Sequence, residues 1–337
     1  KLRIKLNDKK ENKIFAEGLY KFNKDRDYAK YKIDNSFNKL KSQFNVNLDL
    51  NEHFLIEILN YEKKEDKIAN ITAIFDFIDK EKKIKNINYQ EGNNLILLNK
   101  IEINKNNQIK KFEKIKIKTF KDKKENNNFE IVFGKKITIK GKSYDSTNLI
   151  KNINKNENNN AFKTINKEIR ISFENIHTKL LIPLNNFNLI GKIEKGKFVK
   201  ISSKSEFSKD SYLDISLKKD PNNNKKILEI YSGFAKPLLA DFNFFKGIEG
   251  GQLLFTSTFD EKSSSSNLQI KNFKVLDAPA FAKLLALADL GGIAVLLSGE
   301  GLDFESMEIK FKDDKNVRTI SEIYAVSPSL TILMEGY

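Results

Sequence analysis

Apolar and polar residues alternate along much of the chain. The period of two recurs in segments such as KIEIN, KIKIK, KITIKG, EIRISF, YLDISLK and NLQIKNF. Because successive side chains of a strand point to opposite sides, each segment predicts a strand with one apolar and one polar face. Polar stretches such as NDKKEN, NKNNQ, KDPNNNK and EKSSSSN lie between such segments and predict hairpin turns. The pattern therefore predicts a mainly β chain, with a meandering, mostly antiparallel sheet that has one apolar face.

One stretch interrupts this pattern and divides the chain. Residues 151–167 are rich in asparagine and have no sustained periodicity, which is typical of a linker. We therefore expect an N-terminal β segment over residues 1–150 and a second β region over residues 168–337. Two short helical segments are predicted in the second region, near residues 234–245 and 279–297.

The least polar passage of the chain, LLALADLGGIAVLLSGEGLDF at residues 284–304, belongs to the later helical segment. A spanning helix needs about 20 mainly apolar residues, and Asp289, Gly291 and Glu300 interrupt the run. The segment is therefore predicted to be too short to cross a membrane. It has an apolar stripe at helical spacing, followed by a second short turn. The side chains assigned to this helical lid or gate are Phe281, Leu284, Leu285, Ala288, Leu296 and Leu297.

The formal net charge of +15 suggests nucleic acid as a partner, but the distribution of charge argues against it. The excess comes from lysine, with arginine present only at positions 3, 26, 170 and 318. Arginine is the residue favoured for bidentate phosphate and base contacts. Lysine instead alternates with apolar residues in segments such as KKFEKIKIKTFK, which predicts a solvated strand face. We therefore expect no nucleic-acid partner.

Residues that carry catalysis or bind metals are sparse. Cysteine is absent, so neither a disulfide nor a thiolate metal site is possible. The two histidines, His53 and His177, lie far apart in sequence and are interpreted as structural. The segment GKKITIKGKS resembles a phosphate-binding loop, but six residues separate its glycines where the motif has four. The sequence therefore predicts no enzyme, no cofactor and no metal site.

The C-terminal residues resemble a known family. The passages SGFAKPLLADFNFFKGIEGG, NFKVLDAP followed by FAKLLALADLGG, LLSGEGLDF, and SPSL followed by Gly336 are similar, in this order, to passages of AsmA-like bacterial envelope proteins, the group that includes YhdP and is related to TamB. KKITIKGKSYDSTNLI is similar to an earlier passage of the same family, so the resemblance covers about residues 130–337. It implies a C-terminal fragment of a periplasmic protein that an N-terminal helix anchors in the inner membrane of Gram-negative cells. Such proteins are thought to carry phospholipid towards the outer membrane on a long curled β-sheet that forms a groove.

The sequence leaves two alternatives for how the apolar face is covered. Alternation alone favours an ordinary sandwich, in which a second sheet buries that face. The resemblance favours an open groove that binds acyl chains, and the side chains expected to line it are Ile101, Ile103, Ile115, Ile117, Ile137, Ile139, Ile169, Ile171, Phe173, Leu213, Ile215 and Leu217. The corresponding functions are phospholipid transport between the two membranes and, as the alternative, a structural or assembly scaffold of the envelope with a closed core. An outer-membrane barrel is disfavoured because lysine would then face the lipid and tryptophan is absent.

Overall fold

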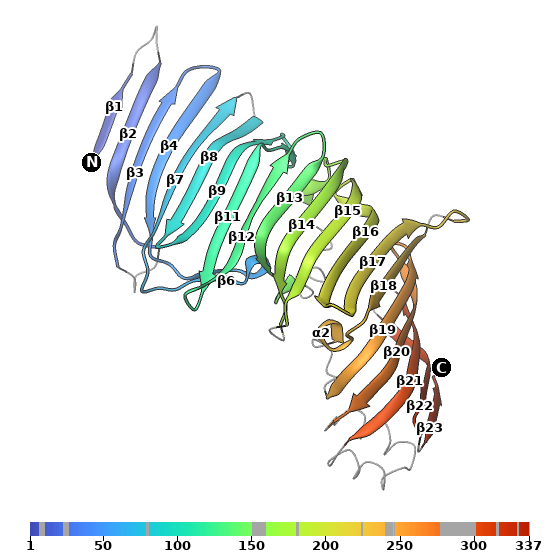
Figure 1. Cartoon of the computed structure of the whole chain (residues 1–337). Coiled ribbons are helices and arrows are strands. Elements are labelled where there is room, and N and C mark those ends of the chain that lie inside the picture. The colour runs from blue at the N-terminus through green and yellow to red at the C-terminus, as the bar shows by residue number, and fades with distance from the viewer. Residues whose placement is uncertain are drawn as a thin grey trace. The chain divides into compact units, whose positions relative to one another are not determined.

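The computed structural model describes residues 1–6, 11–22, 27–78, 81–149, 160–179, 182–223, 225–239, 245, 247–276, 301–314, 317–328 and 330–336. Most of these residues are in strands (Figure 1), so the prediction of a mainly β chain built on a long open sheet is confirmed. The chain divides into two compact units. The first comprises Lys1–His177 and Lys192–Phe198, and the second comprises Thr178–Gly191 and Val199–Tyr337.

The sheet of the first unit follows the chain order. Up to β13 each strand pairs antiparallel with the next, except that β7 pairs with β4 and β11 pairs with β9. The end of β9 also pairs with the short β10, and the last strand, β14, lies parallel to β13. The strands are β1 (Leu2–Lys5), β2 (Asn12–Tyr20), β3 (Ala29–Phe37), β4 (Lys41–Leu50), β7 (Ala69–Ile78), β8 (Glu81–Glu91), β9 (Asn94–Ile103), β10 (Ile109–Lys111), β11 (Lys114–Lys121), β12 (Lys124–Phe133), β13 (Ile137–Asp145) and β14 (Lys167–His177).

Tight turns between these strands follow from local backbone geometry. Asp122 and Lys123 join β11 to β12 with φ angles of 49° and 64°. Positive φ at both positions gives a two-residue hairpin turn whose twist matches that of the flanking strands. This tight turn is in keeping with the meander that the sequence predicts, but the serines of EKSSSSN, which were predicted to form a turn, lie in the strand Ser263–Val275.

The last pair of the first unit departs from the antiparallel expectation. Strand β14 lies parallel to β13, with Ile169 opposite Ile137 and Ile171 opposite Ile139. A parallel pair needs a long crossover connection, and residues 146–166 supply it. The end of this connection belongs to the first unit: η2 (Asn160–Phe162) precedes Ile165, which is buried, and Thr164, which donates a hydrogen bond to the Ile109 carbonyl. The unit boundary therefore follows β14, whereas the sequence suggests a boundary at residues 151–167.

A second, two-stranded sheet belongs to the connection between β4 and β7. It consists of β5 (Phe54–Ile56) and β6 (Tyr61–Lys63), joined by the 3-10 turn η1 (Glu57–Leu59). We call residues 51–68, which contain these elements, the strap.

The second unit is also a meander. Its strands are β15 (Leu184–Glu194), whose end belongs to the first unit, β16 (Lys197–Ser208), β17 (Ser211–Lys219), β18 (Lys226–Ser232), β19 (Ile248–Phe259), β20 (Ser263–Val275), β21 (Leu302–Asp314), β22 (Val317–Val326) and β23 (Thr331–Glu335). Each described pair from β16 to β23 is antiparallel.

The core of the second unit lies on one face of β19–β23. Ile270, Val275 and Met307 are almost completely buried there, and the rings of Phe273 and Phe304 stack with centroids 5.2 Å apart. The helix α2 (Lys236–Leu239) contributes the buried Leu239 to this cluster.

Of the predicted helices, the one near residues 234–245 corresponds in part to α2, and residues 240–244 lie outside the described residues. The segment at 279–297 also lies outside them, together with Phe281, Leu284, Leu285, Ala288, Leu296 and Leu297. Within the described ranges, no helix has the length and apolarity that a bilayer crossing requires.

Candidate functional site

The pairing registers of the first unit align apolar side chains on one face of its sheet. Residues directly opposite each other in an antiparallel pair project to the same face. Ile115 lies between Leu98 and Ile131, and the register continues from Ile131 to Ile139 and then to Ile171. We call this side of β2–β14 the isoleucine face.

All nine predicted side chains of the first unit lie on the isoleucine face. Ile101, Ile117, Ile137, Ile169 and Phe173 are buried, and Ile103, Ile115, Ile139 and Ile171 are partly buried. The other three predicted residues lie in the second unit, where the register places them on one face of β17. Leu213 and Leu217 are buried there, and Ile215 is partly buried. Leu217 lies opposite Leu228 of β18, and Ile215 lies opposite Ile230.

The isoleucine face is wider than the sequence indicated. The registers extend it beyond β9 through β8, β7, β4 and β3 to β2, over five strands for which no site residue was predicted. The alternation in FNVNLDL and ITAIFDF could have identified these side chains. The added members are Ile14, Ala16, Tyr31, Ile33, Phe44, Val46, Leu48, Ile71, Ala73, Phe75, Ile84, Ile87, Ile96, Leu98, Phe129, Ile131 and Phe133. At about 4.8 Å per strand, the ten strands β2–β14 give a width of roughly 43 Å.

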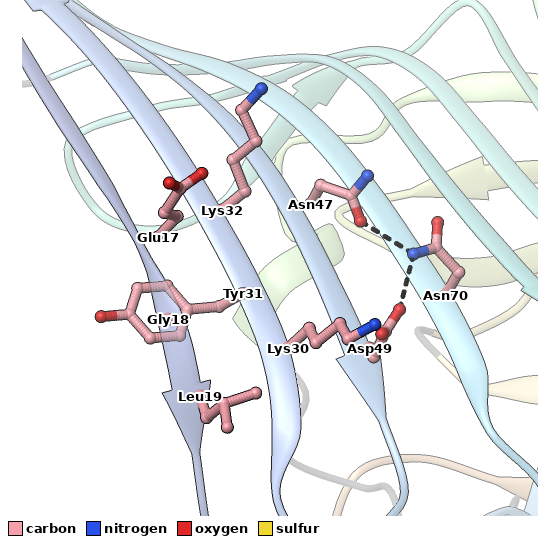
Figure 2. A pocket seen from close by; sticks show the side chains of 9 residues that line it. All are labelled: Glu17, Gly18, Leu19, Lys30, Tyr31, Lys32, Asn47, Asp49 and Asn70. Atoms are coloured by element: carbon pink, nitrogen blue, oxygen red, sulfur yellow. Dashed lines mark hydrogen bonds between the residues drawn. The ribbon is translucent and has the colours of Figure 1, made fainter. Parts of the chain in front are cut away.

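The opposite side of the same sheet is polar. Lys114, Lys116 and Lys118 alternate with the isoleucines of β11, and Lys114 and Lys118 form ion pairs with Glu130 and Glu125 of β12. A hollow of about 480 Å³ lies on this side over β2, β3, β4 and β7 (Figure 2). Charged and amide side chains line most of it, and the Asn70 amide donates to Asn47 at 2.8 Å and to Asp49 at 3.0 Å. The solvated lysine face expected from the alternation is therefore present.

The strap lies across one end of the isoleucine face. Tyr61 and Tyr89 are both buried, and their hydroxyl oxygens are 2.5 Å apart. The Tyr61 hydroxyl also donates to Glu91 of β8 at 3.0 Å. The ring of Phe54 packs edge-on against Tyr89, with centroids 5.7 Å apart. Burial raises the pKa of Tyr89 to about 12, so both hydroxyls remain protonated at neutral pH.

A buried polar network fixes the strap further along the sheet. The Asn127 amide donates to the Leu59 carbonyl of the strap at 2.7 Å and to the Thr119 hydroxyl at 2.8 Å. Asn60 of the strap and Asn126 of β12 donate to the Asp145 carboxylate at 2.9 and 3.1 Å. The strap thus contacts β8, β12 and β13, and covers the end at which the face changes from aliphatic to polar side chains.

The Asp145 carboxylate remains charged despite its burial. Desolvation raises its pKa, but hydrogen bonds from Thr147, Asn60 and Asn126 outweigh this effect, so the pKa is lower than its usual value. Lys63 of the strap is also buried, and it donates to the carbonyls of Lys64 and Lys67 at 3.1 and 2.6 Å. Burial lowers its pKa, although Glu91, Glu52 and other nearby carboxylates oppose the shift.

Among the described residues, no group of three His, Asp or Glu side chains has the geometry of a metal site. His53 lies in the strap, where Nε2 is 3.0 Å from the Glu62 carboxylate and both side chains are about half-exposed. His177 ends β14, and its carbonyl accepts two hydrogen bonds from Ser146.

Comparisons with protein-family models, with curated proteins and with solved structures give no match to this chain.

Proposed function

We propose that the isoleucine face of the first unit binds the acyl chains of phospholipids and shields them from water. In keeping with the resemblance to AsmA-like proteins, the proposed compartment is the periplasm and the proposed process is lipid transport between the inner and outer membranes. The chain acts in this proposal as a carrier surface without catalysis.

The observation that carries the proposal is an apolar face that continues over ten strands and is only partly buried at Ile115, Ile139 and Ile171. Within the described part of the first unit, the only strands outside its sheet are β5 and β6 of the strap. A closed sandwich requires a second sheet over the whole face. An acyl chain on this face would gain about 0.8 kcal/mol for each methylene removed from water.

A scaffold role remains the second candidate, and the second unit favours it. Its cluster of Ile270, Met307, Phe273 and their neighbours is buried by contacts between protein side chains. Burial of these side chains supports a structural role for this part of the chain.

The proposal is tested by native mass spectrometry of the full chain purified from bacterial membranes, with a matched pair of variants. Ile139→Lys places a charge on the isoleucine face, and Thr138→Lys places the same charge on the polar face of the same strand. Because an unpaired charge is costly to bury against hydrocarbon, Ile139→Lys is expected to reduce bound phospholipid at least about tenfold. Thr138→Lys should retain it. A wild-type chain without lipid, or equal retention by both variants with native circular dichroism, would refute the proposal.

A further inference from the structure

The two ends of the strands that form the isoleucine face differ in charge. We call the edge with the strap the strap rim; its connections are the described residues of 21–28, 51–68, 92–93, 122–123 and 146–149. These contain seven carboxylates and five lysines. We call the opposite edge the basic rim; its described connecting residues include 11, 38–40, 104–108, 112–113, 134–136 and 160–166, and these contain two carboxylates and five lysines.

The five described lysines of the basic rim form no ion pair with a carboxylate in the described part of the chain. Lys39, Lys105, Lys135 and Lys163 are exposed, Lys136 is partly exposed, and none forms an ion pair with a described residue. By contrast, lysines within the neighbouring strands are paired, as Lys110 is with Glu81 and Lys111 with Glu102. The rim therefore has positive charge that the described residues do not neutralise.

The isoleucine face remains apolar up to the basic rim. Phe133 and Ile137 flank the turn at Gly134–Lys136, and the ring of Phe112 lies 4.9 Å from that of Phe133. The Lys167 ammonium lies over the Phe133 ring, 4.8 Å from its centroid, and donates to the Gly134 carbonyl at 2.8 Å. At this edge, cationic groups thus lie directly beside hydrocarbon.

We propose that a phospholipid on the isoleucine face has its phosphate at the basic rim and its tails directed towards the strap, an inference that rests on the proposed function. The buried network around Asn127 and Asp145 occupies the strap rim, which excludes a headgroup there. Strand β13 has nine residues, or roughly 27 Å at 3.3 Å per residue. One leaflet's tails occupy about half of a 30 Å hydrocarbon core, so they fit between the basic rim and the strap.

The test compares two lipids with identical acyl chains, phosphatidylglycerol and diacylglycerol, which differ by a phosphate-containing headgroup. The first variant, Lys135→Glu with Lys136→Glu, reverses two charges in the turn after β12. The control, Lys123→Glu with Lys124→Glu, reverses two charges at the strap-rim end of the same strand. Both variants change net charge equally, and binding of each lipid to the full chain is measured by native mass spectrometry.

The wild-type chain is expected to prefer phosphatidylglycerol, because one exposed lysine–phosphate pair contributes up to about fivefold in affinity. The basic-rim variant should lose most of this preference, up to about fivefold, and retain diacylglycerol, while the control keeps the preference. Raising salt from about 50 to 500 mM should weaken it, since the charges are exposed. A photoreactive headgroup should crosslink to residues 133–137 in preference to residues 54–63.

The alternative results are distinguishable. An unchanged preference in the basic-rim variant, or an equal loss in both variants, overturns the headgroup position and leaves acyl binding intact. Displacement of phosphatidylglycerol by equimolar inorganic phosphate would indicate that the basic rim binds free phosphate, and this result would also overturn the proposed headgroup position. If the wild-type chain retains neither lipid, the proposed function itself fails. Circular dichroism checks folding, and Lys135→Gln with Lys136→Gln replaces the first variant if the charge reversal unfolds the chain.

Discussion

Asn127 is the side chain whose loss should release the strap most directly. It is fully buried, and its amide joins β12 to the strap through the Leu59 carbonyl. Its carbonyl oxygen accepts a hydrogen bond from the Asp145 backbone amide at 2.9 Å. Replacing Asn127 with alanine leaves both backbone groups without these partners while the strap is closed.

The magnitude follows from those two groups. A buried donor or acceptor left unsatisfied costs roughly 1–3 kcal/mol. The Leu59 carbonyl keeps a longer contact with the Asn126 amide at 3.5 Å, so the closed strap should lose about 2–4 kcal/mol relative to its open state. At about 1.4 kcal/mol per tenfold, this loss increases the population of the open strap by roughly 30- to 1,000-fold.

Amide hydrogen exchange measures this opening locally, without unfolding of either unit. Exchange at residues 57–63 should accelerate by the stated factor in Asn127→Ala. Asn128→Ala is the control, because the neighbouring amide donates to Glu125 at 3.0 Å and lies outside the strap contacts. If exchange of the strap rises by less than about threefold, or rises equally in both variants, the polar network does not hold the strap in place.

Three further predictions concern the stability of each unit. The depressed pKa of Asp145 stabilises the strap above the unfolded value of 3.8, and this contribution disappears as pH falls through the folded value. The ratio of the strap's exchange rate to the intrinsic amide rate at the same pH should therefore be steady above about pH 5 and rise below about pH 4, and Asp145→Asn should remove this dependence. Gly141→Ala should lower the free energy of unfolding of the first unit by about 1–3 kcal/mol in urea titrations, because the new Cβ would lie 2.3 Å from Phe129 Cβ. The control Gly134→Ala has space for a Cβ and should leave the free energy of unfolding nearly unchanged. Equal effects of the two substitutions would contradict the packing around Gly141. Ile270→Ala should cost the second unit about 2–5 kcal/mol because Ile270 is fully buried in its core, and a thermal melt unchanged from that of Gln269→Ala would count against that core.

The strap shows why part of the candidate site could not be predicted. Asn126 and Asn127 belong to KENNNFEIVF, in which three asparagines in a row interrupt the apolar–polar alternation. A register shift between Thr119 and Phe120 allows both side chains to point inward, where carbonyl and carboxylate groups from residues 59 and 145 accept their hydrogen bonds. A local sequence pattern cannot predict a contact between residues that are 68 positions apart, such as Asn127 and Leu59.

The sequence by itself determined the strands and their two faces. A period of two fixes which side chains share a face, and nine of the predicted lining residues lie together for that reason. Only the tertiary structure decided the parallel placement of β14, the extension of the apolar face to β2, and the closure of one rim by the strap. Alternation is a property of neighbouring residues, whereas pairing order and coverage depend on contacts between distant segments.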